Sequence, residues 1–196
     1  MCTHSVHFYA DAYPAEDASD FIATGLLAGD TCIVMLIQPH RQAVEQRLTA
    51  RGIKTSHQSS HSGSYIAMDT HDALSQLMVD GRLDHDRATE ALGSLMSQTS
   101  GSGRVRLAGD PSPVLFAAGN HEDAIALEAL VDKLATLHSA SVFCAYPIQG
   151  FYRDGNTASL VRVSAEHSVL EFPEGLWVHG YLQPATLPRV GGLEAR

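Results

Sequence analysis

Short apolar runs alternate along the chain with segments in which apolar residues recur every three or four positions. The runs rich in β-branched and aromatic residues predict strands near 5–9, 31–37, 53–57, 64–68, 104–108 and 141–146. The segments of helical period predict helices from residue 21 to a stop at 25–29, and over 41–51, 70–79, 84–97 and 111–138. Because strands and helices alternate, the sequence predicts an α/β three-layer sandwich with a mainly parallel central sheet.

Turn-forming residues give further boundaries. Residues 11–17 read as a turn-rich link before a helix capped by Ser19 or Asp20, and Gly119-Asn120 should break the helix over 111–138. Residues 158–163 and 168–172 are expected to form a terminal pair of strands. We expect one domain over residues 1–173 and a C-terminal extension over 174–196.

The most informative segment is the apolar strand from Thr31 to Ile37 and the turn Gln38-Pro39-His40 that follows it. Strand, turn and helix is the layout in which a phosphate-binding loop would lie. This turn has neither a glycine-rich loop nor the Lys-Ser/Thr pair that binds phosphates and magnesium. The segment therefore predicts the scaffold of a nucleotide-binding protein without its phosphate cradle.

Ligands of parallel α/β sheets bind beyond the carboxyl ends of the strands. The residues that follow the predicted strands form the predicted ligand-binding set: Tyr9, Gln38, His40, Asp110 and Tyr146, with Asp69 and Pro147 nearby. Asp110 has a second interpretation, which we favour, as the N-cap of a helix that begins with Pro111.

Metal and nucleophile patterns are weak in this sequence. The histidine pairs His4/His7 and His57/His61 have no cysteine close to them in sequence, and the three cysteines form no CxxC motif. Cys144 lies within an apolar strand, as a packed thiol does, and no GxSxG elbow is present. We therefore predict no catalytic residues, no metal and no cofactor, and a non-enzymatic protein.

Charge and hydropathy limit the classes of partner and the cellular location that we expect. The formal net charge of −9 and the lack of a Lys/Arg cluster argue against nucleic-acid binding. No apolar run approaches the roughly 20 residues that cross a bilayer, and the first residues do not resemble a secretory signal. We expect a cytoplasmic protein with no membrane contact.

Eight segments, taken in order, resemble the MEDS domain, the methanogen/methylotroph DcmR sensory domain. They include HSVHFY at His4–Tyr9, RVRLAGD at Arg104–Asp110 and FCAYPIQGF at Phe143–Phe151. The remaining segments are FIATGLLAGDTCIVML at 21–36, GSYIAMDTHDAL at 63–74, LMVDGRLD at 77–84, ALEALVDKL at 126–134 and EHSVLEFP at 166–173. The sequence departs from the family where a usual GEM is Gly109-Asp110-Pro111, and where a usual Trp-Asn is Val131-Asp132.

The resemblance implies a RecA/KaiC-like fold that has lost its phosphate loop. It also implies a non-enzymatic sensory role for small organic molecules such as hydrocarbon derivatives, in signal transduction or transcriptional control. Since these residues show no output domain, the signal is expected to pass to a histidine kinase or transcription regulator, or through a homodimer. A divergent ATP-binding domain or ATPase, a metal-dependent enzyme that uses the histidines, and a scaffold without any ligand are the alternatives.

Overall fold

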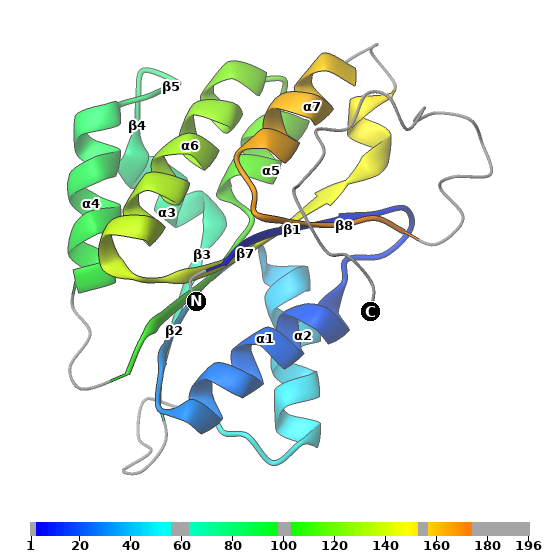
Figure 1. Ribbon diagram of the computed structural model, residues 1–196, viewed down its shortest axis with the longest axis vertical. Helices are drawn as coiled ribbons and strands as arrows, with labels where there is room; N and C mark the ends of the chain where they lie inside the picture. The colour runs from blue at the N-terminus through cyan, green and yellow to red at the C-terminus, as the bar shows by residue number, and fades with distance from the viewer. Residues whose placement is uncertain (1–2, 56–62, 98–102, 153–156, 174–196) are drawn as a thin grey trace, which may run out of the picture.

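A computed structural model describes residues 3–55, 63–97, 103–152 and 157–173. Its centre is a six-stranded sheet with the order β3-β2-β6-β7-β1-β8, in which every neighbouring pair is parallel (Figure 1). The strands are β1 (His4–Tyr9), β2 (Thr31–Leu36), β3 (Ser64–Asp69), β6 (Val105–Gly109), β7 (Ser141–Pro147) and β8 (Val169–Glu171). The predicted parallel α/β sandwich is confirmed, whereas the extension over 174–196 and the end of the predicted strand 53–57 lie outside the described residues.

Helices cover both faces of the sheet, which gives three layers. One face carries α1 (Ala15–Ala28) and α2 (Gln38–Ala50). The other face carries α3 (Thr70–Leu77), α4 (His85–Ser97), α5 (Pro111–Ala117), α6 (His121–His138) and α7 (Thr157–Ala165). A hairpin of β4 (Met78–Val79) and β5 (Arg82–Leu83) and a short 3-10 helix, η1 (Ile148–Phe151), complete the described elements. No helix among the described residues is both long and apolar enough to span a bilayer.

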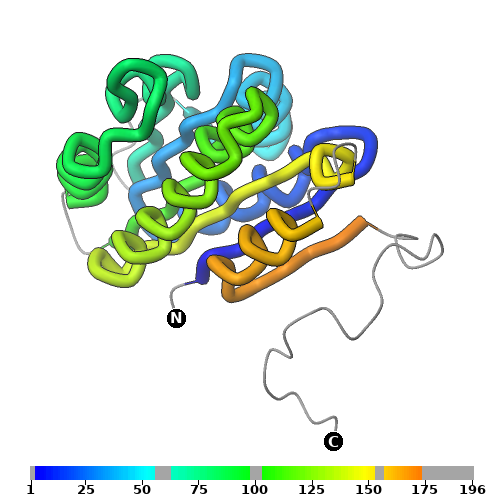
Figure 2. Tube along the Cα trace, turned by 90° about the horizontal axis from the view of Figure 1, so that it is seen from above, coloured from blue at the N-terminus to red at the C-terminus, as the bar shows by residue number. Residues whose placement is uncertain are grey.

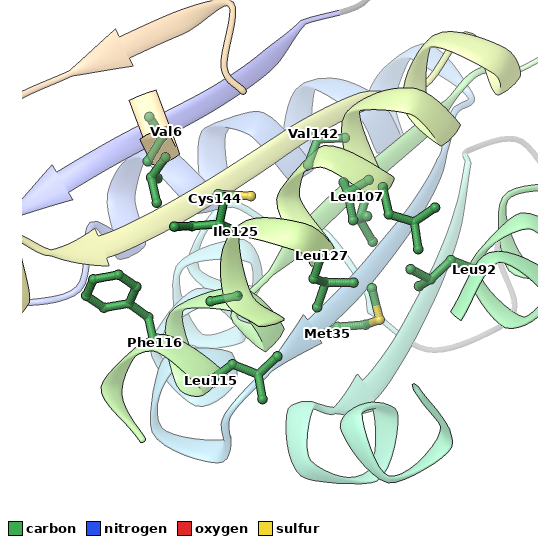
Figure 3. Packing of buried hydrophobic residues seen from close by; sticks show 14 of the residues in the cluster. Val6, Met35, Leu92, Leu107, Leu115, Phe116, Ile125, Leu127, Val142 and Cys144 are labelled. Carbon is green, nitrogen blue, oxygen red and sulfur yellow. The ribbon is translucent and has the colours of Figure 1, made fainter. Parts of the chain in front are cut away.

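Two hydrophobic cores lie on opposite faces of the sheet because successive strand residues point to opposite sides. On β7, Phe143 packs in the core under α1 and α2, while Cys144 and Tyr146 face α5 and α6. Figure 3 shows Cys144 among the apolar side chains of this second, larger core. The strand register pairs Val6 of β1 with Cys144 of β7, so alternate residues of both strands contribute to the same core.

Two sequence predictions near the N-terminus are wrong. Helix α1 begins at Ala15, inside the predicted link, because Ala15 and Ala18 pack in the core in the same helical stripe as Ile22. Ser19 is not an N-cap but lies within the helix, where its hydroxyl donates to the Glu16 carbonyl at 2.8 Å. Apolar packing therefore overrides the turn composition of this segment.

The turn predicted at Gln38-Pro39-His40 is the first turn of α2, with Ile37 at the N-cap. Proline is compatible with this position because the first backbone N–H groups of a helix have no intrahelical acceptor. Further along, the helix predicted over 70–79 ends at Leu77, and Met78–Val79 form β4 instead. The chain turns at Asp80-Gly81 between β4 and β5, and the predicted break at Gly119-Asn120 is confirmed; φ is positive at Asp80, Gly81 and Gly119.

The predicted C-terminal strand pair is also wrong. Thr157–Ala165 is helix α7, whose Leu160, Val163 and Ser164 are buried at helical spacing. Only Val169–Glu171 forms a strand, and it pairs in parallel with β1. The short stretch between α7 and β8 therefore lies against the central sheet, which is important for the site described next.

Candidate functional site

Four polar side chains meet in the larger core: His4, Glu128, Cys144 and His167, named here the core cluster. They come from β1, α6, β7 and the turn between α7 and β8, respectively. Glu128 is fully buried, and the other three residues are exposed by no more than 6%. Buried histidine, carboxylate and thiol groups are rarely gathered in one core without a specific role.

Local structure explains why these side chains converge. His4 precedes Val6 by two residues and so shares its face of β1, and Val6 pairs with Cys144. On α6, Leu127 and Val131 form the buried stripe, and Glu128 lies in that stripe. His167 follows the end of α7, where its Nδ1 atom is 2.7 Å from the Val163 carbonyl oxygen.

The potential ligand atoms are close to one another. Glu128 Oε2 lies 3.4 Å from His4 Nε2 and 3.5 Å from His167 Nε2. Cys144 Sγ lies 3.6 Å from both His4 Nε2 and Glu128 Oε2. The two imidazole centroids are 4.0 Å apart. All four donor atoms lie within 4.8 Å of one another, which is the span of one coordination sphere.

A second layer of groups fixes the orientation of the cluster. The Asp132 carboxylate is 3.3 Å from His4 Nδ1, and the Val163 carbonyl accepts the His167 Nδ1 hydrogen. The Tyr146 hydroxyl donates to Glu128 Oε1 at 2.7 Å. Because a carbonyl oxygen only accepts, His167 is protonated at Nδ1, and its Nε2 lone pair points inward without a hydrogen-bond partner among the described residues.

Burial and charge set the protonation of the cluster. Burial by itself would raise the pKa of Glu128, but His167, His4 and the Tyr146 hydroxyl outweigh it and lower that pKa to about 2. Burial likewise opposes the charged form of His4, yet Glu128 and Asp132 raise its pKa overall. Burial lowers the pKa of His167 and raises that of Cys144. These shifts favour the charged forms of Glu128 and His4 and the neutral forms of His167 and Cys144.

A small cavity of about 20 Å³ adjoins the cluster at Glu128, Cys144 and Ser112. Apolar side chains that include Leu107, Leu127 and Val142 form its other walls (Figure 3). A space of this size holds roughly one water molecule. The cavity can therefore hold one small molecule beside Glu128 and Cys144.

The residues predicted from strand ends do not form one site. Tyr146 lies on the opposite face of the sheet from α2, where its hydroxyl contacts Glu128 of the core cluster, and the Gln38 side chain is exposed at the start of α2. Tyr9, His40 and Asp110 do come together at the carboxyl edge of the sheet, where burial, followed by the Asp110 charge, raises the pKa of Tyr9 to about 12.

Asp110 joins this strand-end cluster, which we define as Tyr9, Tyr13, His40 and Asp110. Its Oδ2 atom accepts from His40 Nδ1 at 2.8 Å and from the Ile37 N–H at 3.2 Å, and the Tyr13 ring stacks on His40. Asp110 occupies the N-cap of α5 as predicted, but its side chain makes no capping hydrogen bond. Its Oδ1 atom and the Tyr13 hydroxyl are buried and have no partner in the described part of the chain.

Sequence reasoning missed the core cluster because its members are far apart in the chain. The prediction of no metal rested on residue spacing, and no two of these four residues are sequence neighbours. Two weak signals were present: a glutamate within the apolar stripe of AIALEALV, and a histidine and a cysteine inside strands. Only the parallel pairing of β1 with β7, together with the turn before β8, brings these signals together.

A model of the family described as MEDS, the methanogen/methylotroph DcmR sensory domain, matches residues 3–163. The chain belongs to the MEDS family. The predicted family is thereby confirmed, and membership indicates a sensory or regulatory role. Three residues of the core cluster lie within the match, and His167 follows its end.

One solved structure supports the fold and nothing finer. A protein of Pyrococcus horikoshii OT3, titled a structural study of Project ID PH0250, superposes with a TM-score of 0.54 at 10% sequence identity. The match covers 88% of this MEDS chain and 82% of that protein. No curated protein matches the chain by sequence. The RecA/KaiC relationship stays a prediction.

Proposed function

We propose that this MEDS domain is a non-enzymatic sensor that binds a small ligand at the core cluster and passes the signal to a separate partner protein. The observation that carries the proposal is the burial of four ligand-type side chains, one of which, His167, has an inward lone pair without a hydrogen-bond partner. A histidine kinase or a transcription regulator is the kind of partner that the family resemblance implies.

The energetic argument supports a retained binding role. Removing ionised groups from water costs several kcal/mol per group, roughly, and well-packed apolar residues often serve stability as well or better. The surrounding core is apolar and closely packed, so burying these four polar side chains lowers the free energy of unfolding unless a bound ligand compensates. A ligand that accepts the inward lone pairs would offset this cost.

Ligand binding at the core cluster can affect the surface of the domain through α7 and β8. His167 lies between α7 and β8, while His4, Cys144 and Glu128 belong to the sheet and to α6. In the described sheet β8 is one of the two edge strands and pairs with β1 alone, and Figure 2 shows α7 and β8 together at one side of the molecule. A ligand bridging His167 to the other three residues would hold α7 and β8 more firmly against the sheet, and a partner could read that change.

The burial of the cluster favours binding over catalysis. A general base must be free to take a proton from a substrate, whereas both oxygens of the fully buried Glu128 carboxylate are already engaged by Tyr146, Cys144 and His4. The ATPase alternative is disfavoured by Asp110, because its carboxylate engages the Ile37 N–H and His40 at the position where a phosphate loop would lie. Wild-type protein mixed with ATP and magnesium should therefore show no binding by calorimetry, and micromolar affinity would contradict this.

The strand-end cluster supports a second location for the ligand. Asp110 Oδ1 and the Tyr13 hydroxyl are buried polar atoms without partners among the described residues, so a small hydrogen-bonding molecule could satisfy both. A His40→Ala, Gln38→Ala double variant should lose ligand binding if this second site is used. Unchanged affinity would leave the core cluster as the site.

Hydrogen exchange tests the sensory proposal. Wild-type protein is incubated with short-chain alcohols, thiols, amines and carboxylates, and separately with divalent cations. At least one class should raise the melting temperature and slow amide exchange in α7 and β8. The His167→Ala variant should lose this response, and His7→Ala should keep it because His7 contacts Asp17 and Phe143 rather than the cluster. Equal responses in both variants would contradict the proposal.

A further inference from the structure

We propose that the core cluster is a tetrahedral site for a divalent transition metal, zinc first, with His4 Nε2, His167 Nε2, Cys144 Sγ and Glu128 Oε2 as its ligands. This inference rests on the proposed function, because it names the ligand class of the same site. It replaces the expectation of no metal that residue spacing produced.

The separations between the donor atoms fit one ion. Zinc bonds are about 2.0–2.2 Å to nitrogen and oxygen and about 2.3 Å to sulfur, so the edges of a zinc tetrahedron measure about 3.3–3.6 Å. The recorded separations are 3.4 Å and 3.5 Å from Glu128 Oε2 to the histidine nitrogens. They are 3.6 Å from Cys144 Sγ to His4 Nε2 and to Glu128 Oε2. These four separations match the edges of a zinc tetrahedron, and the two that join His167 to His4 and to Cys144 stay within 4.8 Å.

The donor set selects the class of metal. Two imidazoles, a thiol and a carboxylate suit zinc and its neighbours in the first transition row. Magnesium and calcium prefer coordination spheres made of oxygen, and this cluster supplies a single carboxylate. With a thiolate and a carboxylate, a divalent ion also forms a site of zero net charge, which suits the apolar core around it.

The outer contacts are those that metal-binding histidines usually have. Ligating histidines commonly donate their second N–H to a carboxylate or to a backbone carbonyl. Here the Asp132 carboxylate is the acceptor for His4 Nδ1, and the Val163 carbonyl oxygen is the acceptor for His167 Nδ1. Tyr146 binds the other oxygen of Glu128, which leaves Oε2 directed at the cluster. Each ligand is therefore oriented by a partner outside the site.

Asp132 also links the buried site to the surface. Its side chain is 47% exposed and lies against His4 Nδ1, whereas the His4 side chain is 2% exposed and directs Nε2 at Glu128. A change at Asp132 can therefore alter the orientation and basicity of the imidazole without touching a ligand atom. Ligation requires the Cys144 thiolate and neutral imidazoles, so protons leave as the metal enters.

Titration with zinc and cobalt tests the inference on the full chain, after metal removal with a chelator. We expect one ion per chain in competition with a chromophoric chelator, and a sulfur-to-cobalt charge-transfer band in the cobalt form. Cys144→Ser should abolish that band and weaken zinc binding, while the matched control Cys32→Ser should behave as wild type. Cys32 is a suitable control because it is the other described buried cysteine and lies in the core under α1 and α2.

A substitution outside the ligand set keeps the inference testable if Cys144→Ser does not fold. Asp132→Asn changes a half-exposed residue outside the ligand set and should weaken zinc binding by about 10–100-fold, as second-shell changes do. Circular dichroism establishes that each variant is folded. Stoichiometric zinc binding that survives in Cys144→Ser, or no binding by folded wild-type protein, would overturn the inference.

The two proposals can fail separately. If organic molecules protect α7 and β8 in wild-type protein but zinc and cobalt do not bind, the metal inference fails and the sensory proposal stands. If zinc binds through Cys144 but exchange in α7 and β8 is unchanged, the metal site stands and the sensory proposal fails.

Discussion

The two polar clusters of this domain differ in whether their ligand-type atoms share one centre. In the strand-end cluster, Asp110 Oδ2 already accepts from His40 and from the Ile37 N–H. In the core cluster, histidine, thiol and carboxylate donor atoms all point to a common centre. The first arrangement closes the position where a nucleotide phosphate would lie, and the second provides a coordination sphere. Position at the end of a strand is therefore a weaker indicator of function than the convergence of several ligand-type atoms.

The largest expected effect comes from removing the charge at the centre of the core cluster. Glu128→Gln leaves His4 without its buried anionic partner and should lower the free energy of unfolding by about 3–5 kcal/mol. Asp110→Asn keeps an acceptor for the Ile37 N–H and should cost less, about 1–2 kcal/mol. Urea denaturation of the metal-free variants measures both. Equal losses would show that the two clusters are energetically alike.

The stability of the protein at acid pH should depend on the same carboxylate, that of Glu128. The pKa of Glu128 is lowered to about 2 in the folded protein from an ordinary value of 4.5. A lowered pKa gives stability that is present above the unfolded value, so metal-free protein should lose on the order of 3 kcal/mol as pH falls from about 4.5 to 2. Glu128→Gln should flatten this part of the profile, measured by urea denaturation at several pH values. A profile unchanged in the variant would assign the acid sensitivity to other groups.

A smaller effect is expected from Tyr146, which was predicted as a ligand-binding strand-end residue and instead supports the core cluster through Glu128. Tyr146→Phe removes the hydroxyl that binds Glu128 Oε1 and should cost about 1.5–3 kcal/mol, the usual range for a hydrogen bond to a charged group. The ring itself stays packed in the core. Thermal unfolding followed by circular dichroism measures the loss. An unchanged melting temperature would show that the hydrogen bond from Tyr146 to Glu128 contributes nothing to stability.

The smallest effect is expected at Gln38. Its side chain is exposed at the start of α2, and surface substitutions of this kind usually stay within about 0.5 kcal/mol. Gln38→Ala should therefore leave both stability and ligand binding as in wild type. Weaker binding in this variant would return the ligand to the strand-end cluster.

The sequence predicted the fold well where local patterns agree with tertiary packing. The apolar runs at Thr31–Leu36 and Ser141–Pro147 are buried strands, and the positive φ at Gly119 separates α5 from α6. The errors arise where packing overrides local composition, as at Ala15, where α1 begins within polar, turn-forming residues. Thr157–Ala165 has β-branched residues and still forms a helix, because its buried positions follow helical spacing.

The two clusters also differ in how far they could be predicted from the sequence. Tyr9, His40 and Asp110 could be grouped from topology alone, since parallel strands end at one edge of the sheet. The core cluster depends on the order of β7, β1 and β8 and on the turn that carries His167, none of which residue spacing encodes. Long-range strand order therefore decided what could not be read from the sequence.

Zinc binding by three variants tests the central claim most directly. Wild-type, His40→Ala and His167→Ala proteins are freed of metal, shown to be folded, and titrated with zinc against a chromophoric chelator. If the core cluster is the ligand centre, His40→Ala should bind one zinc ion per chain as wild type does, and His167→Ala should lose this binding. Zinc binding that is lost in His40→Ala and retained in His167→Ala would contradict the account.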